Sequence, residues 1–145
     1  MTALDGVARH AAREAALQML YQWEVGRASA EEAFATYWPS RDPDGAVPGE
    51  ARAFANGLVR ATIAHVAEAD GLIAAHARNW RLERMAVIDR LVLRLGIAEL
   101  LADPATPATV VINEALELAR TFSGEEPVPF INGVLDAVRK TLKRA

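Results

Sequence analysis

The fold of this chain is decided by PATVVINEALELARTFSGEEPVPFINGVLDAV, which runs from Pro107 to Val138. Apolar residues recur there at steps of three and four, the spacing that places side chains on one face of an α-helix. The first apolar stripe comprises Val111, Ala115, Leu118 and Phe122, and the second comprises Phe130, Val134, Val138 and Leu142. This stretch therefore predicts two amphipathic helices separated by a short break.

A glycine interrupts the second of these helices. Asn132 and Gly133 lie in the middle of an otherwise regular helical pattern. Glycine in a helix interior is less favourable than alanine by about 1 kcal/mol. We therefore expect Gly133 to be present for a packing reason.

Composition predicts one helical domain without a metal or cofactor. A chain of 145 residues is long enough to bury a core, and its 52% hydrophobic but only 6% aromatic residues favour aliphatic helix packing. It has no cysteine, which excludes disulfides and thiolate metal sites. The histidines, His10, His65 and His76, do not have the spacing of metal ligands.

Hydropathy and charge indicate where the protein works and what it contacts. No run of about 18 uncharged residues occurs, and the N-terminus lacks the apolar stretch of a signal peptide. We therefore expect a cytoplasmic protein without membrane contact. The net charge of −3 counts against strong solitary binding to nucleic acid. This net charge is compatible with a local basic site that binds nucleic acid together with a partner protein.

Helix start and stop patterns predict about seven helices. Gly26 should end the first helix, and Ser29 with Glu32 forms a capping-box pattern at the start of the second. The segment 39–49 is rich in proline and glycine and predicts a surface loop, and 78–80 predicts a junction. The helices expected before Pro107 cover residues 7–25, 30–38, 50–77 (as two helices) and 84–101, the last of them apolar on nearly all sides and therefore buried.

Three sequence blocks resemble the NusB family of bacterial transcription antitermination factors. They are AREAALQMLYQWE at 12–24, IDRLVLRLGIAELL at 88–101, and INEALELAR at 112–120 followed by FINGVLD at 130–136. The resemblance implies an all-α fold of about seven helices in two packed subbundles, and a single NusB-like domain over residues 1–145. It also implies binding to boxA-type RNA together with NusE, the small-subunit ribosomal protein. The two would act in an antitermination complex with RNA polymerase during ribosomal RNA synthesis.

The first helix carries a small basic patch. Arg9 and Arg13 are four residues apart, and His10 is three residues from Arg13, so we expect the three on one surface. The residues alone favour a solvated helix start, whereas the resemblance implies contact with boxA RNA. Arginine suits that contact because its planar fork grips phosphate and stacks on bases. Ala8 and Ala11 stand where the family commonly has further arginines, which predicts weaker RNA binding.

Phe130 has two readings. As the first member of an apolar stripe it belongs to the core. The resemblance instead places it near an RNA surface, where stacking on a base contributes about 1–3 kcal/mol. Pro129 stands where the family often has lysine, which again predicts reduced RNA affinity.

The expected NusE surface rests on the resemblance alone, which assigns Tyr21, Glu83 and Asp89 to it. From the residues themselves, Tyr21 would be partly buried with its hydroxyl in contact with water, and the two acids would be ordinary surface charges. An acidic surface suits a basic ribosomal protein because complementary potentials steer association.

Other charged groups have simpler interpretations. Glu125 and Glu126 precede a helix, where acids are favoured. The basic residues Arg139, Lys140, Lys143 and Arg144 either suit a helix C-terminus or extend an RNA-facing strip.

Motifs of hydrolases and nucleotide-binding enzymes are absent, so we expect no catalysis. Two alternatives stay open: a NusB-like module of an RNA-modifying enzyme, and a homodimer that masks the RNA surface. The first is disfavoured because no methyltransferase sequence follows before the chain ends at Ala145.

Overall fold

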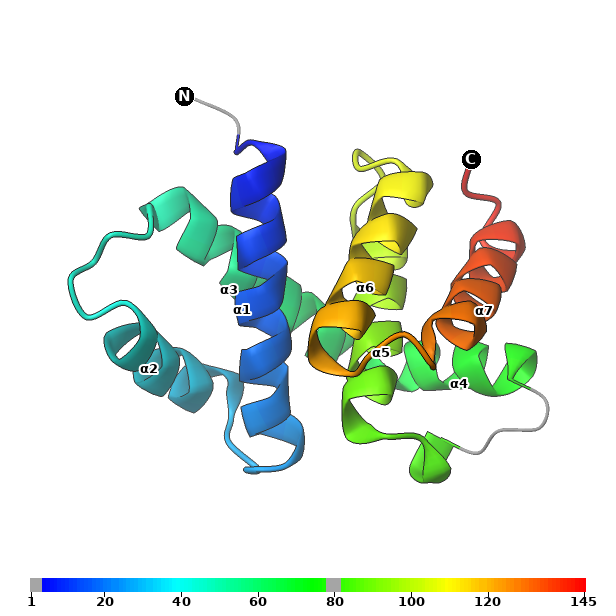
Figure 1. The fold of residues 1–145 in the computed structure, drawn as a ribbon, viewed down its shortest axis with the longest axis horizontal. Coiled ribbons are helices and arrows are strands. Elements are labelled where there is room, and N and C mark those ends of the chain that lie inside the picture. The colour runs from blue at the N-terminus through cyan, green and yellow to red at the C-terminus, as the bar shows by residue number, and fades with distance from the viewer. Residues whose placement is uncertain (1–3, 78–81) are drawn as a thin grey trace. The chain divides into compact units, whose positions relative to one another are not determined.

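The computed structural model describes residues 4–77 and 82–145, and the junction predicted at 78–80 lies outside them. The described residues contain α-helices and one short 3₁₀-helix but no strand, so the all-α prediction is confirmed (Figure 1). The elements are α1 (Gly6–Glu24), α2 (Ala30–Arg41), α3 (Gly49–Ala64), α4 (Val66–His76), η1 (Leu82–Arg84), α5 (Val87–Ala102), α6 (Ala108–Phe122) and α7 (Val128–Thr141).

The helices form two compact units, as expected for a fold of two subbundles. The first unit is Met1–Arg60, which contains α1, α2 and most of α3. The second is Ala61–Ala145, which contains the end of α3 and all later elements.

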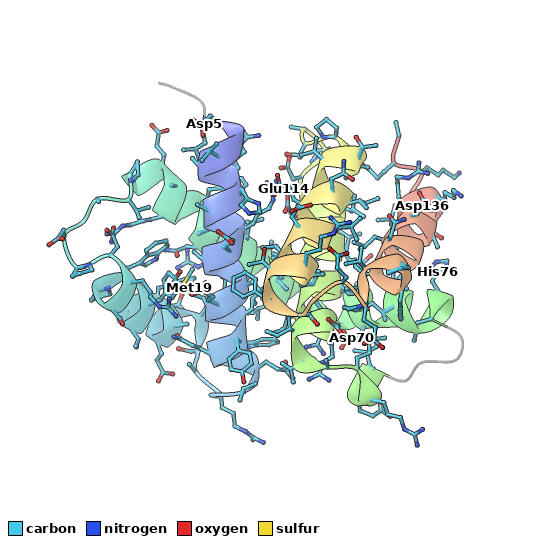
Figure 2. The ribbon with its side chains drawn as sticks, viewed as in Figure 1. Asp5, Met19, Asp70, His76, Glu114 and Asp136 are labelled. Atoms are coloured by element: carbon cyan, nitrogen blue, oxygen red, sulfur yellow. The ribbon has the colours of Figure 1, made fainter. Side chains whose placement is uncertain are left out.

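Capping fixes the helix starts in the first unit. The Asp5 side chain accepts a hydrogen bond from the Ala8 backbone N–H at 2.7 Å, so α1 begins at Gly6 (Asp5 is labelled in Figure 2). The predicted capping box of α2 is confirmed, because Ser29 and Glu32 each accept from the other's backbone N–H at 3.1 Å.

The predicted loop begins three residues later than expected. Pro39, Ser40 and Arg41 belong to the last turn of α2 rather than to the loop. Proline removes one backbone donor, but Tyr37 and Trp38 are buried and hold this turn against the first unit.

Asp42 organises the remaining loop. Its carboxylate accepts hydrogen bonds from the backbone N–H groups of Ala46 and Val47, each at 2.9 Å, and pairs with the Arg52 guanidinium. These bonds, that of Val47 above all, hold the pKa of Asp42 below its usual value.

Helix α5 is the centre of the second unit. It packs against α4, α6 and α7, and all its residues from Leu91 to Leu100 are buried. The prediction of a buried central helix is therefore confirmed, although residues 82–84 form η1 and α5 begins only at Val87. The buried Arg94 donates two hydrogen bonds to Asp70 of α4, at 2.7 and 2.8 Å, so its charge is paired (Asp70 is labelled in Figure 2).

The packing reason expected for Gly133 is wrong. Gly133 is exposed, and no described atom lies within 4 Å of the position that its Cβ would take. Close packing is found instead at Gly96 in α5. A Cβ there would lie 3.3 Å from a methyl group of Leu135 in α7 and 3.6 Å from the Ala115 Cβ in α6.

Arg144 ties the C-terminus to the connection between α5 and α6. Its guanidinium donates to the backbone carbonyls of Leu100, Asp103 and Thr106, the last at 2.7 Å. Arg139 in turn donates to the Arg144 carbonyl at 3.0 Å and to Asp136 at 2.8 and 3.0 Å. These two arginines therefore connect the end of α7 to the α5–α6 connection, a structural role that neither of the two sequence-based interpretations included.

Candidate functional site

A cavity of about 340 Å³ opens in the second unit where two junctions between elements meet. The junction between η1 and α5 forms one side, and the junction between α6 and α7 forms the other. The lining residues are Arg84, Met85, Ala86, Asp89, Leu93, Ser123, Glu126, Pro127, Phe130 and Ile131. Two residues expected at different surfaces, Asp89 and Phe130, therefore line the same cavity.

Asp89 gives this cavity an unsatisfied acceptor. The residue lies in the first turn of α5, where the positive end of the helix dipole favours an acid. Its Oδ1 atom is buried and accepts no hydrogen bond from the described residues. A buried carboxylate oxygen without a donor is costly, so a hydrogen-bond donor that reached this atom would relieve that cost.

Phe130 lies at the edge of the core rather than inside it. The buried positions of α7 are Val128, Ile131, Val134, Leu135 and Val138, and Phe130 is only partly buried. At its N-terminal end, the buried stripe therefore contains Ile131 in place of the predicted Phe130. Phe130 combines an anchored ring with access to the cavity.

Arg9 and Arg13 of α1 share one aromatic partner in the first unit. Their guanidinium carbons lie 5.7 and 5.6 Å from the centroid of the Phe54 ring in α3, within the range of a cation–π contact. Arg9 is partly buried, but Arg13 is only 2% exposed. The expectation that Arg13 is an ordinary surface residue is therefore wrong, because periodicity could not reveal the aromatic ring on α3.

His10 lies on the same turn with a different neighbour. Its Nε2 atom is 3.8 Å from a carboxylate oxygen of Glu14, and both side chains are about one-third exposed. Protonation of His10 would therefore complete an ion pair at the edge of the basic patch.

The sequence matches a known family along most of its length. A family model described as the NusB family matches residues 10–140. The chain belongs to the NusB family.

Relatives within the NusB family are similar along nearly their whole length. The transcription antitermination protein NusB of Koribacter versatilis is 47% identical over 134 residues, which cover 92% of this chain and 90% of that protein. The protein of the same name from Myxococcus xanthus is 45% identical over 137 residues, with coverage of 94% and 98%.

A solved structure shows the same fold. The chain matches one in a crystal structure of the antitermination factors NusB and NusE in complex with double-stranded RNA. The TM-score is 0.83 at 27% identity, and the match covers 94% of this chain and 99% of that chain. The NusB fold expected from three sequence blocks is therefore confirmed.

The expected partner-binding residues are divided between the two units. Tyr21 lies on α1 in the first unit and is 43% exposed, which agrees with the partial burial expected of it. Glu83 is exposed on η1 in the second unit, and Asp89 follows on α5. Asp89 is not an ordinary surface charge, because one of its oxygens is buried.

Sequence reasoning missed Glu126 and Arg84 as lining residues. Glu126 was interpreted only as an acid before a helix, and its neighbour Glu125 indeed pairs with Arg120 at 3.3 Å. Glu126 instead borders the cavity opposite Arg84 and Asp89. A break between two amphipathic helices, rich in charge, was the feature of the sequence that could have indicated it.

Within the described residues, no helix combines the length and hydropathy that a membrane crossing requires. The same residues contain no group of three side chains able to hold a metal ion.

Proposed function

We propose that this chain is a non-catalytic transcription antitermination factor that binds boxA-type RNA together with NusE during ribosomal RNA transcription. The observation that carries the proposal is the likeness, over 94% of the chain, to a chain in a NusB–NusE–RNA structure. The chain would act in the cytoplasm, as one NusB-like domain over residues 1–145, within an antitermination complex that contains RNA polymerase.

Arg9, His10, Arg13 and Phe130 form the proposed RNA-binding set. Arg9 and His10 are partly exposed on adjacent positions of α1, where a phosphate could reach them. Arg13 would act through Phe54, because its buried guanidinium holds the ring on which Arg9 also lies. Phe130 would offer a ring face for stacking.

Tyr21, Glu83 and Asp89 form the proposed NusE-binding set. The acids suit a basic partner, and the buried Asp89 oxygen suits a donor from that partner. Since Phe130 and Asp89 line one cavity, RNA binding and NusE binding would be coupled there.

A fluorescence anisotropy titration tests the proposal with labelled boxA RNA and a scrambled RNA of equal length. Binding by the chain alone should be weak, since it is acidic overall and its basic patch is small. Addition of NusE should tighten binding to boxA but not to the scrambled RNA. Tight binding of both RNAs by the chain alone would contradict the proposal.

A matched pair of variants tests whether Arg9 belongs to the RNA-binding surface. Arg9→Gln should flatten the dependence of log affinity on log salt by roughly 0.7 if it neutralises one phosphate of single-stranded RNA. Arg27→Gln changes an exposed arginine beyond the end of α1 and serves as the control. Equal salt slopes for the two variants would remove Arg9 from the RNA surface.

A further inference from the structure

A second cavity, of about 420 Å³, lies entirely within the first unit. Alanine side chains of α1 form one wall, and α2, the loop after it and the start of α3 form the others. Half of the lining residues are alanines, and the others are Tyr37, Trp38, Arg41, Asp42, Val47 and Pro48. This cavity is separate from the one that contains Asp89 and Phe130.

Two polar side chains on the aromatic side of this cavity, Trp38 and Asp42, already have hydrogen-bond partners. The Trp38 indole N–H donates to the Asn56 side chain at 2.9 Å. Asp42 accepts two backbone hydrogen bonds and pairs with Arg52. A ligand with many polar atoms would leave them unpaired here, which costs free energy.

Arg41, unlike Trp38 and Asp42, has a polar group that is available to a ligand. It is exposed in the last turn of α2, and its guanidinium carbon lies 5.8 Å from the centroid of the Tyr37 ring. No carboxylate among residues 4–77 and 82–145 pairs with it. An apolar cavity therefore has an available positive charge beside it.

We propose that this cavity is a docking site for a protein segment that inserts an apolar side chain and places a carboxylate on Arg41. Apolar contact with the alanine wall would supply most of the affinity. The charge on Arg41 would select acidic over basic segments. A protein segment is favoured over RNA, because the alanine wall suits an aliphatic side chain, whereas a nucleobase would leave most of its polar edge unpaired against it.

Three synthetic 12-residue peptides serve as probes of this site. They share one leucine pattern and differ only in flanking residues, which are glutamate, glutamine or lysine. Titrations of the full chain are followed by amide and indole NMR shifts. The glutamate peptide should shift the signals of Ala8, Ala46, Ala51 and the Trp38 indole. The glutamine peptide should bind about two- to five-fold more weakly, as for loss of one exposed ion pair, and the lysine peptide more weakly still.

Two variants, each with a matched control, separate the contribution of the apolar contact from that of the charge. Ala11→Leu fills the cavity and should weaken the glutamate peptide at least about tenfold, roughly the effect of losing a buried contact. Ala74→Leu, at an exposed position of α4, should leave binding unchanged. Arg41→Gln should abolish the preference for glutamate over glutamine without weakening the glutamine peptide, and Arg27→Gln should preserve that preference.

Several results would overturn this inference. Equal affinity for the three peptides, or no shift at the lining residues, would exclude the docking site. Wild-type peptide affinity in Ala11→Leu, with helical content intact by circular dichroism, would place the peptide elsewhere. If boxA RNA shifted these signals and the peptides did not, the cavity would be an RNA subsite.

Discussion

Arg13 of α1 is held against Phe54 of α3, with its guanidinium carbon 5.6 Å from the ring centroid and only 2% of the residue exposed. A cation–π contact removed from water contributes about 2 kcal/mol, and the aliphatic stem adds packing. Arg13→Ala should therefore lower the free energy of unfolding by about 1–2 kcal/mol in a urea titration. Lys140→Ala, at an exposed site, should change it by less than about 0.5 kcal/mol. Equal losses in the two variants would mean that the contact with Phe54 contributes nothing.

Asp42 should give the stability of the first unit an acid-sensitive component. The pKa of Asp42 is lower in the folded chain than its usual value, chiefly because the Val47 N–H stabilises the carboxylate. The resulting stabilisation is complete above the unfolded pKa of about 4 and is lost as the pH falls through the lower folded pKa. Denaturant unfolding at pH 7 and pH 3 should therefore show a smaller loss on acidification for Asp42→Asn than for the wild type. Asp44→Asn, in the same loop, should keep the wild-type pH dependence.

Gly133 and Gly96 should respond oppositely to the same substitution. Gly133→Ala should raise the free energy of unfolding by about 1 kcal/mol, because the site is helical and has open space. In Gly96→Ala the same gain is opposed by crowding against Leu135, which costs about 1–3 kcal/mol. The net result for Gly96→Ala should lie between no change and a loss of about 2 kcal/mol. A stabilised Gly96→Ala variant would show that Leu135 can move aside.

Arg144 should contribute to stability through its three carbonyl partners. Arg144→Ala leaves these carbonyls without their charged donor, and we expect a loss of about 1–3 kcal/mol in the free energy of unfolding. Hydrogen exchange should also accelerate at Ala105 and Thr106 in the adjacent connection. Wild-type stability and exchange would indicate that water replaces the guanidinium without cost.

Asp89 should matter more than Glu83 for the proposed contact with NusE. Asp89→Asn removes a charge from the cavity at a buried oxygen, whereas Glu83→Gln removes one that solvent already screens. In a calorimetric titration with NusE, we expect about a tenfold loss for Asp89→Asn and less than about threefold for Glu83→Gln. The reverse order would move the interface away from the cavity.

Local patterns predicted those features that depend on neighbours in sequence. The capping box of Ser29 and Glu32 was predictable because its two hydrogen bonds span only three residues. The buried run of α5 was predictable because a helix without a polar face requires partners on all sides.

Features that depend on distant elements were not predictable in this way. The burial of Arg13 depends on a ring from α3, and the meeting of Asp89 with Phe130 depends on how α5 and α7 pack. The expectation for Gly133 was wrong because the cost of a helical glycine indicates that a reason exists, not that the reason is packing. Gly96 was not singled out because the side chains that crowd it, Leu135 of α7 and Ala115 of α6, lie far from it in sequence.

The hydrogen bonds from Arg144 to three backbone carbonyls also set the order in which this region can fold during synthesis. The carbonyl of Asp103 is 41 residues earlier in the chain than the guanidinium that binds it. At a translation rate of about 5–20 residues per second, this carbonyl leaves the ribosome about 2–8 s before its donor. Throughout that interval the turn between α5 and α6 depends on contacts within residues already made. A nascent chain arrested before Arg144 should therefore carry this turn less protected than in the folded protein, and open to proteases and chaperones until Arg144 emerges.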